Sequence, residues 1–186
     1  MTDYDNTDIP SVYDRARDHG PVVSDLWMRM VAEAVGNNTV SCHFADRAAA
    51  ARECQRVLSP NGTVAIRTAT AEQIASYPCT PFFPPSVALM EETLPGRADV
   101  RGMFAAAKLS VVDWKLVAQT IAPDWSVYAE KLAAGGDSIL ARLSTANFED
   151  GLAAVRRYAS SGGREPVAEL IDFFVCRHRS NEASIE

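Results

Sequence analysis

The sequence predicts an α/β fold, and three patterns indicate it. Residues 46–68 contain a helix, a tight turn and a strand in direct succession. Two later segments, 109–118 and 166–177, are rich in β-branched and aromatic residues, which is typical of strands. Around these segments, apolar residues recur with the 3.6-residue period of helices. At 186 residues with 47% hydrophobic content, the chain can bury one sizeable core. We therefore expect a single domain over residues 1–186, with residues 1–10 frayed.

The segment 46–68 carries the clearest local signals. Asp46 is a good helix N-cap, because its side chain accepts a hydrogen bond from the first turn and its charge suits the positive helix end. Pro60-Asn61-Gly62 is a turn, since proline presets φ and glycine permits positive φ. Val64 and Ile66 then alternate with Ala and Arg, as in a strand. These residues predict a helix that turns directly into a buried strand.

The other elements follow from periodicity, capping and proline content. The run Tyr77–Pro85 is expected to be a rigid loop, because its four prolines lack backbone donors. Within 109–118, the alternation predicts that Val112, Trp114 and Leu116 share one face of the strand. The expected order is a helix over 21–35, a short helix after Thr70, the loop 77–85, a helix around 100–107, the strand 109–118, helices beginning near 123 and 148, and the strand 166–177.

Charge and composition exclude several classes of protein. The net charge of −6 argues against nucleic acid as a partner, since phosphate binding needs a basic surface. No apolar run approaches the ~18 residues of a membrane helix. Residues 1–10 hold three aspartates and neither Lys nor Arg, so we expect no signal peptide. Cys42, Cys54, Cys79 and Cys176 form no Cys-x-x-Cys pair, which favours reduced cytoplasmic thiols over disulfides or a metal site.

Two stretches resemble a known family. Cys42-His43-Phe44-Ala45-Asp46, with Glu53 through Gly62 after it, is similar to the second half of class I S-adenosylmethionine-dependent methyltransferases. In that family a His-Phe-x-Asp stretch ends the fourth strand, and the next helix finishes with Arg-Val-Leu-x-Pro-Gly-Gly before the fifth strand. Asn61 stands here in place of the first of those glycines. The likeness continues at residues 13–17 and 125–140.

The resemblance implies a sheet with strand order 3-2-1-4-5-7-6, in which residues 39–43 form strand 4 and residues 63–68 form strand 5. The sequence lacks what the family places before strand 4, a glycine-rich turn that approaches the cofactor and an acidic residue that binds its ribose. After Asn38 the chain continues directly with Thr39. We therefore expect a partial Rossmann-like methyltransferase sheet that lacks strands 1–3, with flanking helices. We expect no cofactor, and no methyl transfer by this chain alone.

Without strands 1–3, residues 39–43 would be an edge strand. An apolar edge strand offers unpaired N–H and C=O groups to other chains. We therefore expect an obligate complex, either with a second methyltransferase-like chain or with another copy of this chain through the 39–43 edge. The stoichiometry of that complex stays open.

A small-molecule substrate is expected at the same interface, because ligands of α/β sheets bind at the carboxyl ends of strands. His43 could act there as an acid or base, or could be a packed residue. Arg67 could hold a sulfate, phosphate or carboxylate, or could form an ion pair with a neighbouring carboxylate. Tyr77 and Phe82 could form an aromatic pocket wall, or could simply cover the core. The sequence assigns no catalytic residue and no metal ligands.

Two functions agree with this pattern. In the first, the chain is a non-methylating subunit of a heteromeric natural-product biosynthetic enzyme. The resemblance extends here to the methyltransferase-like pairs of azinomycin-type antibiotic biosynthesis, which close an aziridine ring by intramolecular displacement of a leaving group such as sulfate. In the second, the chain is a catalytically silent pseudoenzyme that stabilises or activates a full-length methyltransferase.

Overall fold

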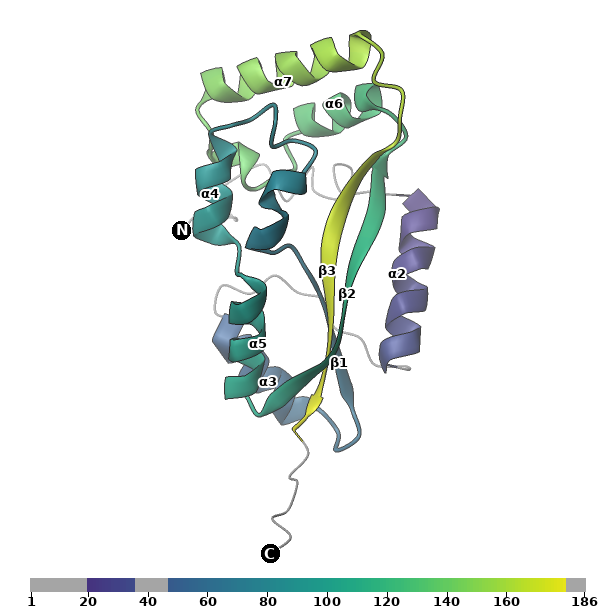
Figure 1. Cartoon of the computed structure of the whole chain (residues 1–186), viewed down its shortest axis with the longest axis vertical. Coiled ribbons are helices and arrows are strands. Elements are labelled where there is room, and N and C mark those ends of the chain that lie inside the picture. Colours follow the sequence, from purple (N-terminus) through teal and green to yellow (C-terminus); the bar gives the residue numbers. More distant parts are fainter. Residues whose placement is uncertain (1–19, 36–46, 180–186) are drawn as a thin grey trace, which may run out of the picture. The chain divides into compact units, whose positions relative to one another are not determined.

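The computed structural model describes residues 20–35 and 47–179 (Figure 1). The predicted helices and strands in these ranges are confirmed, and two further elements, the helix α4 and the 3₁₀ helix η3, were not predicted. The predicted strand 39–43 and the predicted cap Asp46 lie outside the described residues. The elements, in order, are α2 (Gly20–Val35), α3 (Arg47–Val57), β1 (Thr63–Thr68), the 3₁₀ helix η2 (Ala71–Ser76), α4 (Ser86–Thr93), α5 (Arg97–Ala106), β2 (Leu109–Ala122), α6 (Trp125–Ala133), the 3₁₀ helix η3 (Leu140–Arg142), α7 (Thr145–Ser160) and β3 (Val167–His178).

The chain divides into two compact units, which are described one at a time. Of the described residues, unit 1 holds 20–24, 71–94 and 118–170. Unit 2 holds 25–35, 47–70, 95–117 and 171–179. The strands β2 and β3 contribute residues to both units. No helix among the described residues is long and apolar enough to cross a membrane.

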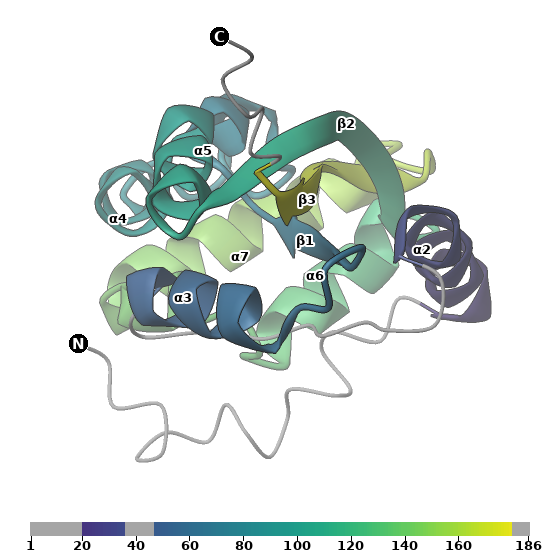
Figure 2. The ribbon, with the colours of Figure 1, turned by 90° about the horizontal axis from the view of Figure 1, so that it is seen from below.

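The strands form one three-stranded antiparallel sheet with the order β1-β3-β2 (Figure 2). The β1–β3 register pairs Thr63 with Arg177 at one end and Thr68 with Asp172 at the other. In the numbering that the resemblance supplies, this is the order 5-7-6, the end of the expected methyltransferase sheet. The α/β class and the predicted strands are therefore confirmed for the described part of the chain.

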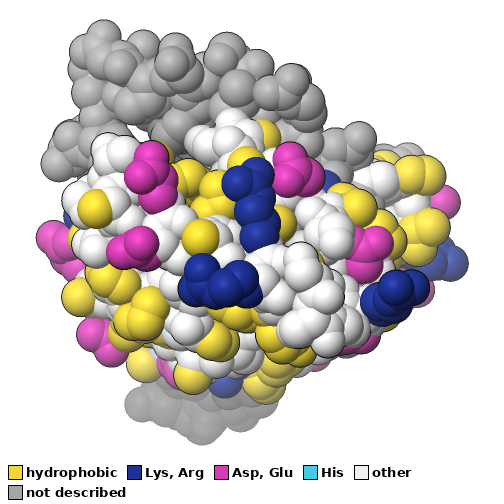
Figure 3. Space-filling view, turned by 90° about the horizontal axis from the view of Figure 1, so that it is seen from above, with side chains coloured by type: hydrophobic (Ala, Val, Ile, Leu, Met, Phe, Trp, Pro, Cys, Tyr) yellow, Lys and Arg dark blue, Asp and Glu magenta, His cyan; other side chains and the backbone are white. Residues whose placement is uncertain are grey.

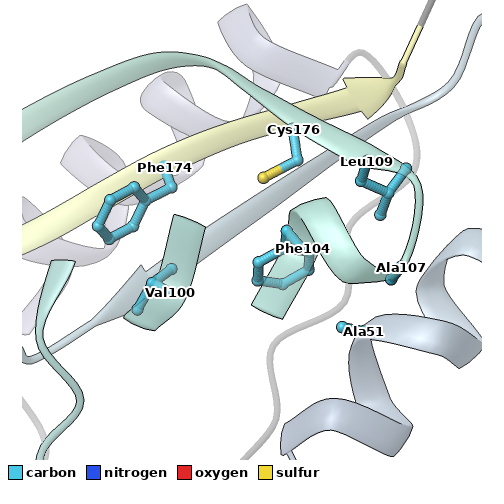
Figure 4. Close-up of a cluster of buried hydrophobic side chains, with 7 residues drawn as sticks. All are labelled: Ala51, Val100, Phe104, Ala107, Leu109, Phe174 and Cys176. Atoms are coloured by element: carbon cyan, nitrogen blue, oxygen red, sulfur yellow. The ribbon is translucent and has the colours of Figure 1, made fainter. Parts of the chain in front are cut away.

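In unit 2, one face of the sheet packs against α3 and α5. Ala51 of α3 and Phe104 of α5 are almost fully buried against Phe174 and Cys176 of β3 (Figure 4). The spacing of Val100, Met103, Phe104 and Ala107 predicted this apolar face of α5. Val64 and Ile66 of β1 complete the same cluster. This face therefore contains the larger of the hydrophobic clusters of unit 2.

The opposite face of the sheet in unit 2 packs against α2. Phe173 and Val175, which alternate with Phe174 and Cys176 along β3, point to this side. The α2 residues packed there recur at helical spacing and are Leu26, Trp27, Met30, Val31 and Ala34. Unit 2 thus has its sheet between two helical layers, with alternate side chains of β3 buried on each side.

The side chains of β2 do not alternate as the sequence predicted. Val111 and Trp114 both pack on the α5 face, although they are three positions apart. Val112 instead lines a surface hollow together with Asp113 and Phe173, which marks the α2 face. The alternation of side chains along β2 is therefore interrupted between Val111 and Trp114. The expectation that Val112 and Trp114 share a face was wrong, because the sequence carries no signal of this interruption.

Unit 1 is built from helices around the loop 77–85, which is confirmed to contain neither helix nor strand. An ion pair of 3.1 Å joins Arg156 of α7 to Glu130 of α6. Phe83 of the loop is fully buried and contacts Phe148 of α7. Figure 3 shows one face of the molecule, on which basic and acidic side chains are interspersed. On α7, residues such as Glu149, Asp150 and Arg156 are exposed, so this helix has a solvated face.

We predict that Gly151→Ala destabilises the protein. A Cβ atom at Gly151 would overlap the Phe83 ring and lie 2.9 Å from the Phe82 carbonyl oxygen, so the loop must move away from α7. Overpacking of this kind costs about 1–3 kcal/mol, more than alanine contributes by helix propensity. Gly102→Ala on α5 is the matched control, because a Cβ there meets nothing within 4 Å. Chemical denaturation should show a lower midpoint for Gly151→Ala only; equal midpoints would contradict the packing described here.

Candidate functional site

A buried carboxylate marks the most polar point of unit 2. Asp172 is fully buried, and the residues that follow it, Phe173 to Cys176, are also buried but apolar. It lies opposite Thr68, the last residue of β1. An ionised carboxylate in such surroundings is stable only when charged or polar donors satisfy its oxygens.

Three donors from three different segments meet Asp172. The hydroxyl of Thr70, just beyond β1, donates to Oδ2 at 2.6 Å. The Nε–H of Arg97, the first residue of α5, donates to Oδ1 at 2.7 Å. The indole N–H of Trp114 on β2 donates to the same Oδ1 at 2.6 Å. The carboxylate thereby connects β1, α5 and β2 to β3, and we call these four residues the Asp172 cluster.

Arg97 is held in two ways within the cluster. Its Nε is hydrogen-bonded to Asp172, and its guanidinium lies over the Trp114 ring at 4.6 Å from the ring centroid. The side chain of Arg97 is 25% exposed, whereas that of Asp172 is not exposed at all. A guanidinium fixed by a carboxylate and an aromatic face is oriented before any ligand arrives. The arrangement therefore places a partly exposed, rigid cation close to the carboxyl end of β1.

The predicted site residues are not brought together within one unit. Arg67 lies in unit 2, where its guanidinium sits 4.7 Å from the centroid of the Trp27 ring. Because Arg67 pairs with Phe173 and not with Asp172, it points to the α2 face, opposite the Asp172 cluster. Tyr77 and Phe82 lie in unit 1, and His43 lies outside the described residues.

Tyr77 and Phe82 both pack within unit 1. Tyr77 is buried. Phe82 contacts Trp125 and Tyr158, with ring centroids 5.4 and 5.6 Å away. Glu165 accepts hydrogen bonds from the Trp125 indole and the Tyr158 hydroxyl. Rings at these separations fill the space between them. In this arrangement Phe82 packs against its aromatic neighbours inside unit 1.

The thiols resemble core residues more than reactive groups. Burial raises the pKa of Cys79 to about 12, and burial likewise raises the pKa of Cys176 to about 12. Burial also raises the pKa of Tyr128, which shares a hydrogen bond with Cys79. Both thiols therefore stay protonated near neutral pH and are poor nucleophiles. Among the described residues, no group of three His, Cys, Asp or Glu side chains could hold a metal ion.

A shallow hollow lies on the surface of unit 2, and another lies on the surface of unit 1. In unit 2, a hollow of about 290 Å³ is lined by apolar residues such as Met30 and Phe173 and by charged residues of both signs, including Glu33 and Arg177. In unit 1, a hollow of about 250 Å³ is mostly apolar and includes Asp137. The Asp137 carboxylate accepts the N–H groups of residues 139 and 140, at the point where the short helix η3 begins.

The Asp172 cluster was not found from the sequence. One signal was present, a single acidic residue inside the apolar run 170–176, because a buried charge requires partners. The partners themselves carry no local signal. Thr70, Arg97 and Trp114 are separated from Asp172 by 102, 75 and 58 positions in the chain.

No protein-family model matches the chain, and no protein of curated function matches it. Solved structures similar to part of it include apo mycolic acid cyclopropane synthase CmaA1, with 18% identity over 72% of this chain and 54% of that chain, TM-score 0.34. A putative sarcosine dimethylglycine methyltransferase from Galdieria sulphuraria has 17% identity over 75% and 49%, TM-score 0.36. Cyclopropane synthase MmaA2 from Mycobacterium tuberculosis has 15% identity over 70% and 49%, TM-score 0.33. The chain spans about half the length of these proteins.

We predict that Asp172→Asn lowers the free energy of unfolding by about 3 kcal/mol. The amide keeps the shape of the carboxylate, but it removes the charge that balances Arg97 and turns an N–H₂ group toward donors. Asp150→Asn on the exposed surface of α7 is the control and should change stability by less than about 0.5 kcal/mol. Urea unfolding measures both. Equal midpoints for Asp172→Asn and the unchanged protein would show that the cluster is not a stabilising element.

Proposed function

We propose that this chain is a non-methylating, methyltransferase-like subunit of a heteromeric natural-product biosynthetic enzyme. One observation carries the proposal: the strand order β1-β3-β2 is the order expected for strands 5, 7 and 6, in a sequence without the glycine-rich turn. The chain would thus keep the half of the fold that approaches the substrate and lack the half that holds the cofactor. A partner chain would supply the opposite wall of the site.

The reaction that we propose is closure of an aziridine ring. The nitrogen of a substrate amine attacks the neighbouring carbon that carries a sulfate ester. The C–N bond forms as the C–O bond breaks, and sulfate leaves with the bonding electron pair. The proton lost by nitrogen passes to a base or to water. This displacement needs no redox partner, and it depends on alignment of the amine with the leaving group and on stabilisation of the departing anion.

A cation close to the leaving group is the main requirement on the protein. Arg67 suits this role because it is exposed at the next-to-last position of β1 and is steadied by the Trp27 ring. A guanidinium can bind sulfate through two parallel N–H groups. Arg97 is a second cation near the same end of β1, on the other face of the sheet, but its side chain is mostly buried, at 25% exposure, whereas that of Arg67 is exposed. The proposal therefore assigns the leaving group to Arg67 and a supporting structural role to Arg97.

A catalytically silent partner of a full-length methyltransferase is the alternative. Exposed apolar side chains in unit 2 favour an interaction role of some kind. Val57 at the end of α3 is 60% exposed, and Met28 on α2 is 68% exposed. Such residues suit contact with another protein, whether or not this chain takes part in chemistry. The two functions differ in whether a side chain of this protein changes the rate.

We predict that Arg67→Ala slows ring closure by roughly 100-fold without preventing assembly. The enzyme is reconstituted from this chain and a methyltransferase-like chain encoded beside it, and release of sulfate from a 2-aminoalkyl sulfate is followed. Arg52→Ala on the exposed surface of α3 is the control, because it removes the same charge away from β1. Size-exclusion chromatography reports assembly. Assembly with turnover that is unchanged by Arg67→Ala would favour the silent partner.

A further inference from the structure

β2 is an edge strand of the sheet in the described part of the chain, with β3 on its inner side. Its central residues are unusually exposed for a strand. Val112 is 52% exposed and Leu116 is 40% exposed. Between them, the side chains of Asp113 and Lys115 are 50% and 55% exposed. An edge strand of this kind offers backbone hydrogen bonds to another strand.

The sequence of this edge is symmetric in chemical character. Trp114 is the centre of the segment Val112–Leu116. Its two neighbours are an acid, Asp113, and a base, Lys115. The next residue on each side is aliphatic. In an antiparallel pair of identical strands centred on Trp114, Asp113 of each copy therefore stands opposite Lys115 of the other copy. Opposite charges directly across an antiparallel pair stabilise that register.

We infer that the β2 edge is a docking surface for a second copy of this chain. The two β2 strands pair antiparallel about a two-fold axis at Trp114, which joins the two sheets into one. A two-fold axis makes the interface self-complementary, as in most homodimers. The symmetric placement of Asp113 and Lys115 selects this partner and this register, because a shift of the register by two residues sets like charges against each other.

Asp113, Trp114 and Lys115 already contact one another within a single copy, and these contacts can be replaced by contacts with a second copy. The Asp113 carboxylate accepts the backbone N–H of Trp114 at 2.8 Å, and it lies 3.7 Å from Nζ of Lys115. These contacts occupy polar groups at the edge that an unrelated strand would otherwise pair with. In the pair, the carboxylate turns to Lys115 of the other copy, and the Trp114 N–H becomes available to a backbone carbonyl. The charges thus replace one set of partners with an equivalent set.

The side chain of Trp114 leaves room for the second strand. Its indole N–H is bound to Asp172 at 2.6 Å and its ring lies under Arg97, so the side chain is fixed against the α5 face. Two indoles that meet across the two-fold axis therefore keep their places within their own copies. A paired segment of about five residues forms a small interface, and such interfaces are weak. The dimer should accordingly dissociate on dilution.

The test is a pair of charge-reversed variants, Asp113→Lys and Lys115→Asp, studied by sedimentation equilibrium over a wide concentration range. The unchanged protein should form dimers in a concentration-dependent way. Each variant alone sets like charges across the axis, so its dimerisation should weaken roughly tenfold or more. An equimolar mixture should dimerise again, because the two lysines that the first variant carries at this edge then face the two aspartates of the second.

Recovery in the mixture separates pairing from damage to the fold, since a misfolded variant would not recover. Thermal unfolding of each variant provides a second check on the fold. An unchanged protein that stays monomeric at every concentration would overturn the inference. So would dimers that are indifferent to both variants, or a mixture that associates no better than its components.

Discussion

The charge of Asp172 has to be balanced wherever β3 is buried, and the layout of unit 2 follows from that constraint. β3 lies between β1 and β2 and has helices on both faces, so its carboxylate cannot reach water. The donors must come from the surrounding segments, and they come from Thr70, Arg97 and Trp114. To donate to Asp172, Thr70 must lie just after β1, Arg97 must lie at the start of α5, and the Trp114 side chain of β2 must point to the α5 face.

Most helices and strands could be predicted because local chemistry determines them, but α4 and η3 were not predicted. Pro60-Asn61-Gly62 predicts a turn in any context, and the apolar spacing of α5 predicts its buried face. The faces of β2 could not be predicted, because the interruption of its alternation between Val111 and Trp114 has no signal in the sequence. The Asp172 cluster could not be predicted either, because the register of distant segments brings its members together. Sequence reasoning therefore succeeds within elements and fails where elements meet.

The two faces of the sheet differ in a way that bears on function. On the α5 face, the charge of Arg97 is balanced by Asp172, and the polar groups stabilise the fold. On the α2 face, Arg67 rests against an aromatic ring at an exposed strand position, where a bound anion could approach it. Arg67 could be selected from the sequence because ligands bind at strand ends. Its pairing with Phe173 shows that its side chain lies on the α2 face of the sheet. The reasoning that selected His43 relies on residues outside the described part.

We propose that this chain does not bind S-adenosylmethionine. Binding of that cofactor requires a backbone that approaches it closely through glycines and an acid that holds the ribose hydroxyls, and the sequence contains neither in the expected place. Isothermal titration calorimetry of S-adenosylmethionine into the purified chain tests the claim most directly. The account predicts no binding heat beyond that of dilution. Saturable binding with a micromolar dissociation constant would contradict it.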